Sequence, residues 1–185
     1  MNIDIFAEQA GLAHRSVSTD ASAPAGRQYR IALSRDYSYP IDDVWSAWTD
    51  PHRLGRWLGE PRGELRIGGV VDLVMSPPEG DIAHLQILTC QAPQALSATW
   101  CGSWDTAEPT SEVLVSLLSN SADSTTLTLE HRLLDRGAAI GYGAGWEEFL
   151  CLLAATLLGH SRADPGYDRG ALEAALKTRW EEAAQ

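Results

Sequence analysis

Six short strand-like segments follow one another between residues 64 and 134, and turns of hairpin length rich in Gly, Pro, Ser and Asp separate them. The clearest segment is STTLTLEHRL, in which Leu127, Leu129, His131 and Leu133 alternate with polar residues and therefore share one face of a strand. Consecutive strands joined by short turns pair in antiparallel fashion. The chain is thereby predicted to form an antiparallel meander with one apolar face.

A long helix is predicted directly after these strands, from about residue 140 to residue 159. Its apolar side chains recur at helical spacing and form one wide stripe, made of Trp146, Phe149, Leu150, Leu153 and Leu157. We interpret Glu147 and Glu148 as residues near the helix start, where the positive end of the helix dipole stabilises carboxylates. A sheet with one open apolar face needs a cover, and this helix supplies it.

One strand and two short helices are predicted before the meander. Residues 27–37 alternate as a half-buried strand, and Pro40 then opens a helix with Asp42 and Asp43 in its first turn. Asp50 is the expected N-cap of a second short helix. The whole pattern predicts an α+β fold, in which a curved antiparallel sheet of six or seven strands wraps around the long helix and leaves a cavity between them.

The two ends of the chain differ from this central region. Residues 1–27 end in a stretch of Ser, Ala, Pro and Gly and are expected to form a flexible N-terminal segment. Residues 28–160 form the predicted domain, and residues 161–185 form a predicted C-terminal helical extension. The apolar stripe of this extension, Leu172, Leu176 and Trp180, must pack either on its own domain or on a second subunit, so a homodimer stays open.

The charge of the chain limits its partners. It has 14 Lys and Arg residues against 25 Asp and Glu residues, a formal net charge of −11, and its single lysine is Lys177. Such an acidic chain repels phosphate backbones and anionic membrane surfaces, so we predict no nucleic-acid or membrane partner. Single cysteines without a CxxC pair, and acidic residues where a signal peptide would carry basic ones, favour a cytoplasmic protein.

The common motifs of metal, nucleotide and hydrolase chemistry are missing. The sequence contains no HExxH, no GxSxG and no GxxxxGK[ST] motif, and its five histidines show no i, i+4 pairing. We therefore predict no metal and no cofactor.

Four segments together resemble the SRPBCC superfamily, whose members share the helix-grip fold. These segments are IDDVWSAWTDPHRLGRWLG, GELRIGGVVDLVM, STTLTLEHRLL and GYGAGWEEFLCLLAATLLG. They are most similar to the branch named after homologues of the activator of the heat-shock-protein-90 ATPase, and the resemblance spans about residues 28–160. It implies the helix-grip fold, but members of the superfamily include binding modules, chaperone activators and cyclase or dehydratase enzymes, so the fold does not select a function.

The leading hypothesis is a binding module that holds a small apolar or amphipathic ligand in the cavity between the sheet and the long helix. Pockets of this kind are mostly apolar, with a few placed polar groups. The predicted ligand-binding residues are aromatic, aliphatic or histidine side chains: Trp57, Leu73, Met75, His84, Trp100, Val113, Val115, Leu129, His131, Trp146 and Leu150.

Two alternatives remain open. The resemblance implies a co-chaperone-like domain that contacts a chaperone, although the chain matches only the C-terminal-type domain of those activators. An enzyme of the cyclase or dehydratase kind would use the same cavity, with His131 and Tyr142 as the candidates for proton transfer. We favour binding over catalysis.

Overall fold

A computed structural model describes residues 9, 11–75, 80–105, 111–164 and 169–184 of the chain. It contains an antiparallel eight-stranded sheet of order β1-β2-β8-β7-β6-β5-β4-β3. The strands are β1 (His14–Thr19), β2 (Tyr29–Tyr37), β3 (Glu60–Gly63), β4 (Val70–Val74), β5 (Ile82–Gln91), β6 (Ala95–Gly102), β7 (Ser111–Ser121) and β8 (Ser124–Leu134). The described helices are α2 (Ile41–Thr49), α3 (Pro51–Leu54), α4 (Arg136–Leu157) and α5 (Arg169–Ala183).

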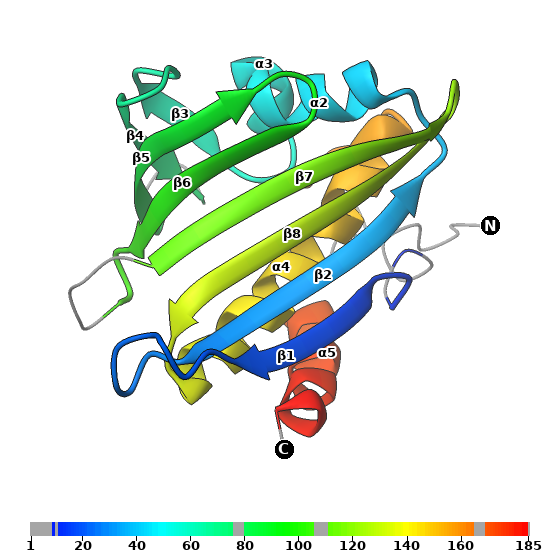
Figure 1. Ribbon diagram of the computed structural model, residues 1–185. Helices are drawn as coiled ribbons and strands as arrows, with labels where there is room; N and C mark the ends of the chain where they lie inside the picture. The colour runs from blue at the N-terminus through cyan, green and yellow to red at the C-terminus, as the bar shows by residue number, and fades with distance from the viewer. Residues whose placement is uncertain (1–8, 10, 76–79, 106–110, 165–168, 185) are drawn as a thin grey trace.

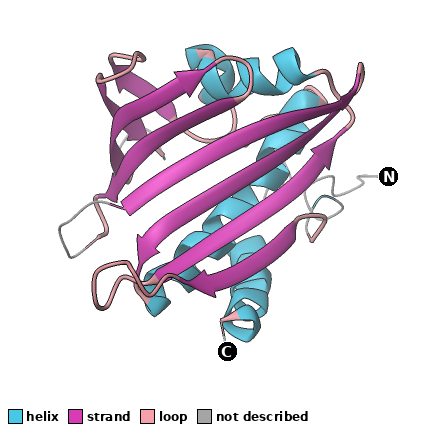
Figure 2. Cartoon of the chain, in the orientation of Figure 1, coloured by secondary structure: helices cyan, strands magenta, loops and turns pink. Residues whose placement is uncertain are grey.

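The sheet and the helices form two layers (Figures 1 and 2). Helix α4 runs behind the curved sheet and contacts β2 and β8, and α2 and α3 lie together at one end of it. Helix α5 lies beside α4 and also contacts β1. The predicted α+β class, the antiparallel sheet, the long covering helix and the two short helices after the strand β2 are confirmed.

The expected number of strands, six or seven, was too low, because β1 forms an additional edge strand. It lies within residues 1–27, which the sequence predicted to be flexible, and it pairs with β2 from His14↔Ser34 to Thr19↔Tyr29. Its sequence, HRSVST, has one apolar residue in six positions and so lacks the alternation that identifies a half-buried strand. The division of the chain into a domain of residues 28–160 and two flanking segments stays a prediction.

The concave face of the sheet forms the core together with α4. Alternate residues are buried along β2, β7 and most of β8. The inward parity predicted for five side chains holds: Leu73, Met75, Val113, Val115 and Leu129 are all at most 6% exposed. The strand predicted at residues 64–67 is shifted, since β3 comprises Glu60–Gly63 instead.

A bulge in β8 overturns the predicted orientation of Leu133. Arg132 pairs with Arg30 and Leu134 with Tyr29, so Leu133 is an extra residue with a left-handed φ of 64°. After the bulge, the alternation of inward and outward side chains continues with the opposite parity. His131 and Leu134 are therefore both buried, although they are three residues apart, while Leu133 leaves the core face.

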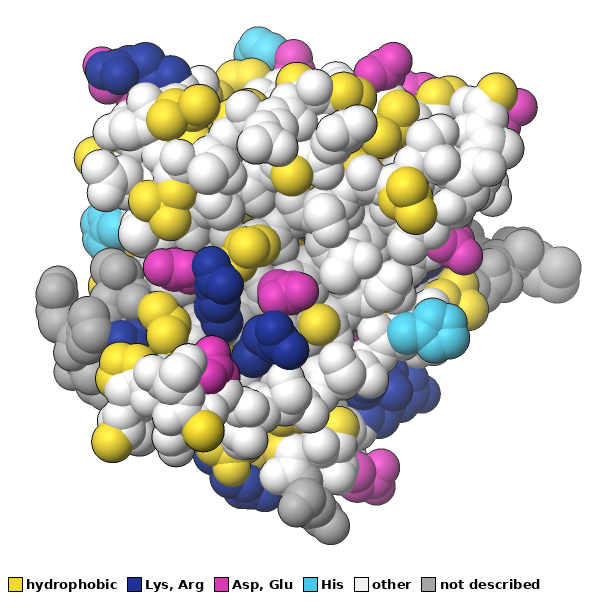
Figure 3. Space-filling view, viewed as in Figure 1, with side chains coloured by type: hydrophobic (Ala, Val, Ile, Leu, Met, Phe, Trp, Pro, Cys, Tyr) yellow, Lys and Arg dark blue, Asp and Glu magenta, His cyan; other side chains and the backbone are white. Residues whose placement is uncertain are grey.

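The opposite face of the sheet is polar. It carries cross-strand ion pairs between β2, β7 and β8, with Arg132 and Glu112 2.8 Å apart and Arg30 and Glu130 3.7 Å apart. Figure 3 views this face, where charged side chains of both signs lie beside one another among mainly uncharged polar surface and scattered apolar side chains. The sheet is thus buried on one side, and the core and any internal site lie between the sheet and α4.

Helix α4 begins earlier than predicted, and this changes the role of its two glutamates. Asp135 caps the helix by accepting a hydrogen bond from the backbone N–H of Ala138 at 2.8 Å. Glu147 and Glu148 consequently lie in the middle of α4, away from the helix start where dipole stabilisation would act, and both are almost completely buried.

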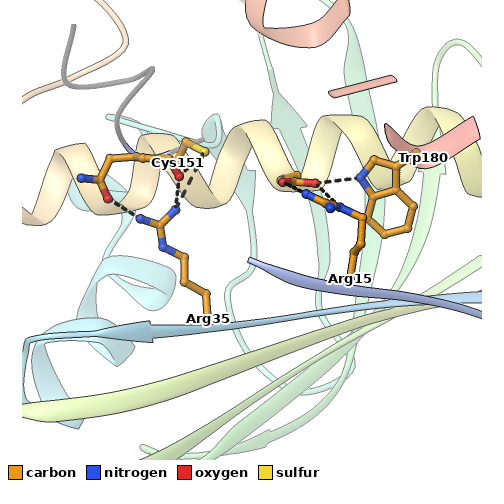
Figure 4. A network of polar contacts seen from close by, with 6 residues as sticks. Arg15, Arg35, Cys151 and Trp180 are labelled. Carbon is orange, nitrogen blue, oxygen red and sulfur yellow. Dashed lines mark hydrogen bonds and ion pairs between the residues drawn. The ribbon is translucent and has the colours of Figure 1, made fainter. Parts of the chain in front are cut away.

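Glu147 is stabilised by two side chains from distant parts of the chain. The Arg15 guanidinium of β1 donates to both of its carboxylate oxygens, at 2.5 and 3.1 Å, and the Trp180 indole of α5 donates at 2.9 Å (Figure 4). A second buried arginine, Arg35 of β2, reaches toward α4 beside Cys151 and donates to Gln9. These contacts connect β1, β2 and α5 to the central helix.

The C-terminal helix packs on its own chain. Leu176 and Trp180 are at most 1% exposed, and the Trp180 ring lies directly on Gly143 of α4. A Cβ atom built on Gly143 would stand 2.3 Å from two carbon atoms of that ring, so α5 can approach this closely only where α4 has no side chain. Within the described residues, no helix is both long and apolar enough to span a lipid bilayer.

The contact between Gly143 and Trp180 predicts a difference between two glycine variants. Gly143→Ala should displace α5 and lower the free energy of unfolding by about 1–3 kcal/mol relative to Gly141→Ala. A Cβ atom at Gly141 would meet nothing within 4 Å, so alanine there should stabilise α4 by about 0.5–1 kcal/mol. Urea unfolding of both variants measures the difference, and equal stabilisation by the two would show that α5 does not pack on Gly143.

Candidate functional site

A cavity of about 400 Å³ lies between the first half of α4 and the sheet around β4, β5 and β6. Pockets that bury small molecules typically have volumes of about 300–1,000 Å³. From α4 it is lined by Gly137, Ala138, Gly141, Tyr142, Gly145, Trp146, Glu148 and Phe149, and from the strands and their connections by Met75, Asp81, Trp100, Trp104 and Asp105.

Five aromatic side chains contribute to its walls. Trp100 of β6 stands edge-on to Trp146 of α4, with ring centroids 4.9 Å apart, and edge-on to Tyr142 at 6.5 Å. Trp104 lies 6.3 Å from Tyr142, and Phe149 lies 6.0 Å from Trp146. This arrangement offers both ring faces and ring edges to an apolar molecule.

The space itself results from a glycine stripe on α4. Gly137, Gly141 and Gly145 are spaced four residues apart and therefore lie on one face of the helix. All three line the cavity, and Cβ atoms built on Gly141 and Gly145 would meet nothing within 4 Å. At these three positions the wall of the cavity is bare helix backbone, because glycine has no side chain that could occupy the space.

His131 lies behind the aromatic wall in a complete hydrogen-bond chain. The Trp146 indole N–H donates to its Nδ1 atom at 3.0 Å, so the ring proton must reside on Nε2. Nε2 lies 2.7 Å from the Ser111 hydroxyl, which in turn donates to the Trp100 carbonyl oxygen at 2.9 Å. Burial lowers the pKa of His131 to about 3, which keeps the imidazole neutral.

This environment gives His131 a structural role. Both ring nitrogens are engaged and the side chain is completely buried, so it offers no accessible lone pair to a substrate. A general base must reach the proton that it abstracts. The hypothesis that His131 transfers protons therefore receives no support from the geometry.

Tyr142, the second candidate for proton transfer, donates to Asp105 at 2.6 Å. Burial, together with this hydrogen bond to a carboxylate, raises the pKa of the Tyr142 hydroxyl above its ordinary value. Tyr142 is consequently a fixed hydrogen-bond donor. It positions Asp105, which also accepts from the backbone N–H of Gly102 at 2.7 Å.

The structure separates the predicted ligand-binding residues into four groups. Met75, Trp100 and Trp146 line the large cavity. A smaller cavity of about 150 Å³ lies on the other side of Trp100 and Trp146, and Leu73 and Val113 contribute to it. The residues that are buried in the core and line neither of these cavities are Trp57, Val115, Leu129, His131 and Leu150. Ligand contact by any of them stays a prediction.

His84 forms the fourth group, because it lies on the outer face of the sheet. It is opposite Asp72 in the β4–β5 register, and its Nδ1 atom lies 2.7 Å from that carboxylate. Its neighbour Ala83 points inward and is fully buried. The sequence of this strand, IAHLQIL, alternates too weakly to indicate which side chains face the core.

Several lining residues were missed by the sequence reasoning. Asp81 and Asp105 lie outside the strands, where no periodic pattern indicates the direction of a side chain. Ser111 is the first residue of β7, and its hydroxyl matters only because β7 places it beside His131. Among the described residues, no group of three or more His, Cys, Asp or Glu side chains is placed to hold a metal ion.

The hydrogen-bond chain predicts an unusual titration for His131. Because its pKa is lowered to about 3 from 6.5, the unfolded chain takes up a proton between these values and the folded chain does not. This residue alone should reduce stability by about 1.4 kcal/mol for each unit by which pH falls within that window. Two-bond ¹H–¹⁵N spectra should show the Nε2–H tautomer unchanged down to pH 4.5, and an imidazolium signal at pH 5 would contradict the assignment.

The model of a protein family described as "Activator of Hsp90 ATPase homolog 1-like protein" matches residues 38–158. Among proteins with curated descriptions, none matches the chain. The crystal structure of CalU16 from Micromonospora echinospora is 32% identical, with a TM-score of 0.72 over 94% of this chain and 97% of CalU16. The solution structure of CalU16 gives 30% identity and a TM-score of 0.74, over 92% of this chain and 94% of that one.

A heat-shock-protein-90 activator from Plasmodium falciparum shares the fold. It is 21% identical, with a TM-score of 0.60 over 70% of this chain and 96% of that protein. Together with the order of strands and the covering helix, the family match confirms the sequence resemblance to the helix-grip superfamily. The chain belongs to the family of Activator of Hsp90 ATPase homolog 1-like proteins.

Proposed function

We propose that the protein is a binding module that holds a small, largely apolar molecule with an aromatic or amphipathic body in the cavity of about 400 Å³. The observation that carries this proposal is the cavity itself, in which bare helix backbone leaves space beside a wall of aromatic rings. Asp81, Trp104, Gly137 and Gly141 on its lining are exposed, so the cavity is open to solvent and accessible to a small molecule.

The polar groups around the cavity are arranged for recognition. Tyr142 and Asp105 bond to each other, and Ser111 and His131 bond to the backbone and to Trp146. None of these side chains forms a pair of nucleophile and accessible base, which acyl or proton transfer would require. The arrangement supports binding and orientation of a ligand more than it supports a cyclase or dehydratase reaction.

We rank contact with a chaperone below ligand binding. The described residues present a formed cavity, whereas the chaperone hypothesis rests on membership in the family alone.

Filling the cavity should abolish binding without unfolding the protein. A leucine at Gly145 would project into the cavity, where a Cβ atom meets nothing within 4 Å. We expect Gly145→Leu to weaken binding of the neutral probe 1-naphthylmethanol at least about tenfold, since the excluded volume costs several ligand contacts. Isothermal titration calorimetry measures this effect, with urea unfolding as the check of stability.

Gly145→Ala is the matched control, because alanine adds one methyl group at the same place. It should retain binding and raise helix stability by about 0.5–1 kcal/mol. Equal affinities for the wild type and for Gly145→Leu would place the probe elsewhere on the protein.

A further inference from the structure

We propose that the cavity selects ligands that carry a positive charge, such as a protonated amine attached to an aromatic or aliphatic body. This inference rests on the proposed function, because it names the class of ligand for the same cavity. Three carboxyl side chains line the cavity, Asp81, Asp105 and Glu148, and no Lys, Arg or His side chain lines it among the described residues.

The three carboxyl groups differ in exposure. Asp81 is exposed, Asp105 is half-buried, and Glu148 is almost completely buried. A cation that enters the cavity therefore meets the exposed carboxylate of Asp81 and the half-buried one of Asp105, where electrostatic attraction is less screened than at the open surface. The carboxylates of Asp81 and Asp105 would repel an anionic ligand.

Asp105 is held in a fixed orientation. Tyr142 and the Gly102 backbone N–H both donate to its Oδ2 atom, at 2.6 and 2.7 Å. Among the described residues none donates to Oδ1, so this oxygen remains as an acceptor beside the cavity. A carboxylate fixed in this way accepts a hydrogen bond from an ammonium group without losing further rotamer freedom.

The aromatic walls favour the same charge. A cation is attracted to the faces of Trp, Tyr and Phe rings within about 6 Å of their centroids, most strongly to Trp. Trp100, Trp104 and Trp146 all line the cavity, together with Tyr142. Ring faces and carboxylates therefore both attract a cationic ligand, and both repel an anionic one.

The sequence next to Asp81 and Asp105 adds negative charge and no positive charge. The segments 76–79 and 106–110 adjoin Met75 and Asp105 in the chain, and their sequences, SPPE and TAEPT, contain one glutamate each and no Lys or Arg. The chain as a whole has a net charge of −11. The local excess of negative charge thus agrees with the charge of the whole molecule.

Three probes of one shape test the inference: 1-naphthylmethylamine, which is cationic at pH 7, 1-naphthylmethanol, which is neutral, and 1-naphthylacetate, which is anionic. Calorimetry in 0.15 M NaCl should give the amine an affinity about tenfold or more above the alcohol, with the acetate the weakest. Raising the salt to 0.5 M should reduce this preference only partly, because a partly buried pair is screened less than surface charges.

Asp105→Asn should lower the affinity for the amine about tenfold and change the affinity for the alcohol less than about twofold. Asp123→Asn removes the same charge from the β7–β8 turn, remote from the cavity, and should leave the preference unchanged. If Asp105→Asn fails to fold, Asp81→Asn supplies the test, since that residue is exposed.

The outcomes distinguish the two proposals. If all three probes bind with equal affinity and Gly145→Leu abolishes all three complexes, the cavity binds ligands and the charge inference is wrong. If no probe binds at millimolar concentration, the proposed function is wrong and the inference fails with it.

Discussion

The ion pair between Glu147 and Arg15 determines how the layers of this protein fit together. Glu147 lies in the middle of a buried helix, and an uncompensated charge there would cost several kcal/mol. Its compensation comes from β1, through Arg15, and from α5, through the Trp180 indole. One buried carboxylate of α4 therefore connects β1 and α5 to the central helix. The C-terminal helix thereby contributes Leu176 and Trp180 to the core, and the edge strand packs against it through Val17 and Arg15.

The parts of the fold that the sequence predicted are those with a periodic apolar pattern. The stripe of Trp146, Leu150 and Leu153 identified α4, and the alternation of Leu127 and Leu129 identified β8 and its buried face. Strand β1 lacked such a pattern because its contribution consists of backbone pairing and one arginine. The bulge at Leu133 left no sign either, since leucine seldom adopts a left-handed conformation. The burial of Glu147 depends on residues more than 30 positions away in each direction, which no local pattern contains.

The residues of the candidate site also differ in how well a local sequence pattern predicts them. Trp100 and Trp146 were predicted because large aromatic side chains on the inner faces of a strand and a helix must meet between them. Trp57 was also predicted to contact the ligand, and it is fully buried, with its indole donating to the Ala47 carbonyl oxygen of α2. Asp81 and Asp105 come from connections whose direction depends on the whole sheet. The residues that we propose to determine the charge of the ligand were thus the least predictable ones.

The hydrogen-bond chain through His131 has a consequence for how the cavity would respond to a ligand. It starts at the Trp146 side chain and ends at the Trp100 backbone, so both aromatic walls are attached to one buried, neutral imidazole. Rotation of the Trp146 ring would break the bond to Nδ1 and leave a polar atom unpaired in the core, at a cost of about 1–3 kcal/mol. An entering molecule consequently meets a preformed surface, and little conformational entropy is lost when it binds. Selection among ligands would then depend on their fit to a rigid shape, and rapid association without a slow rearrangement step would be its kinetic signature.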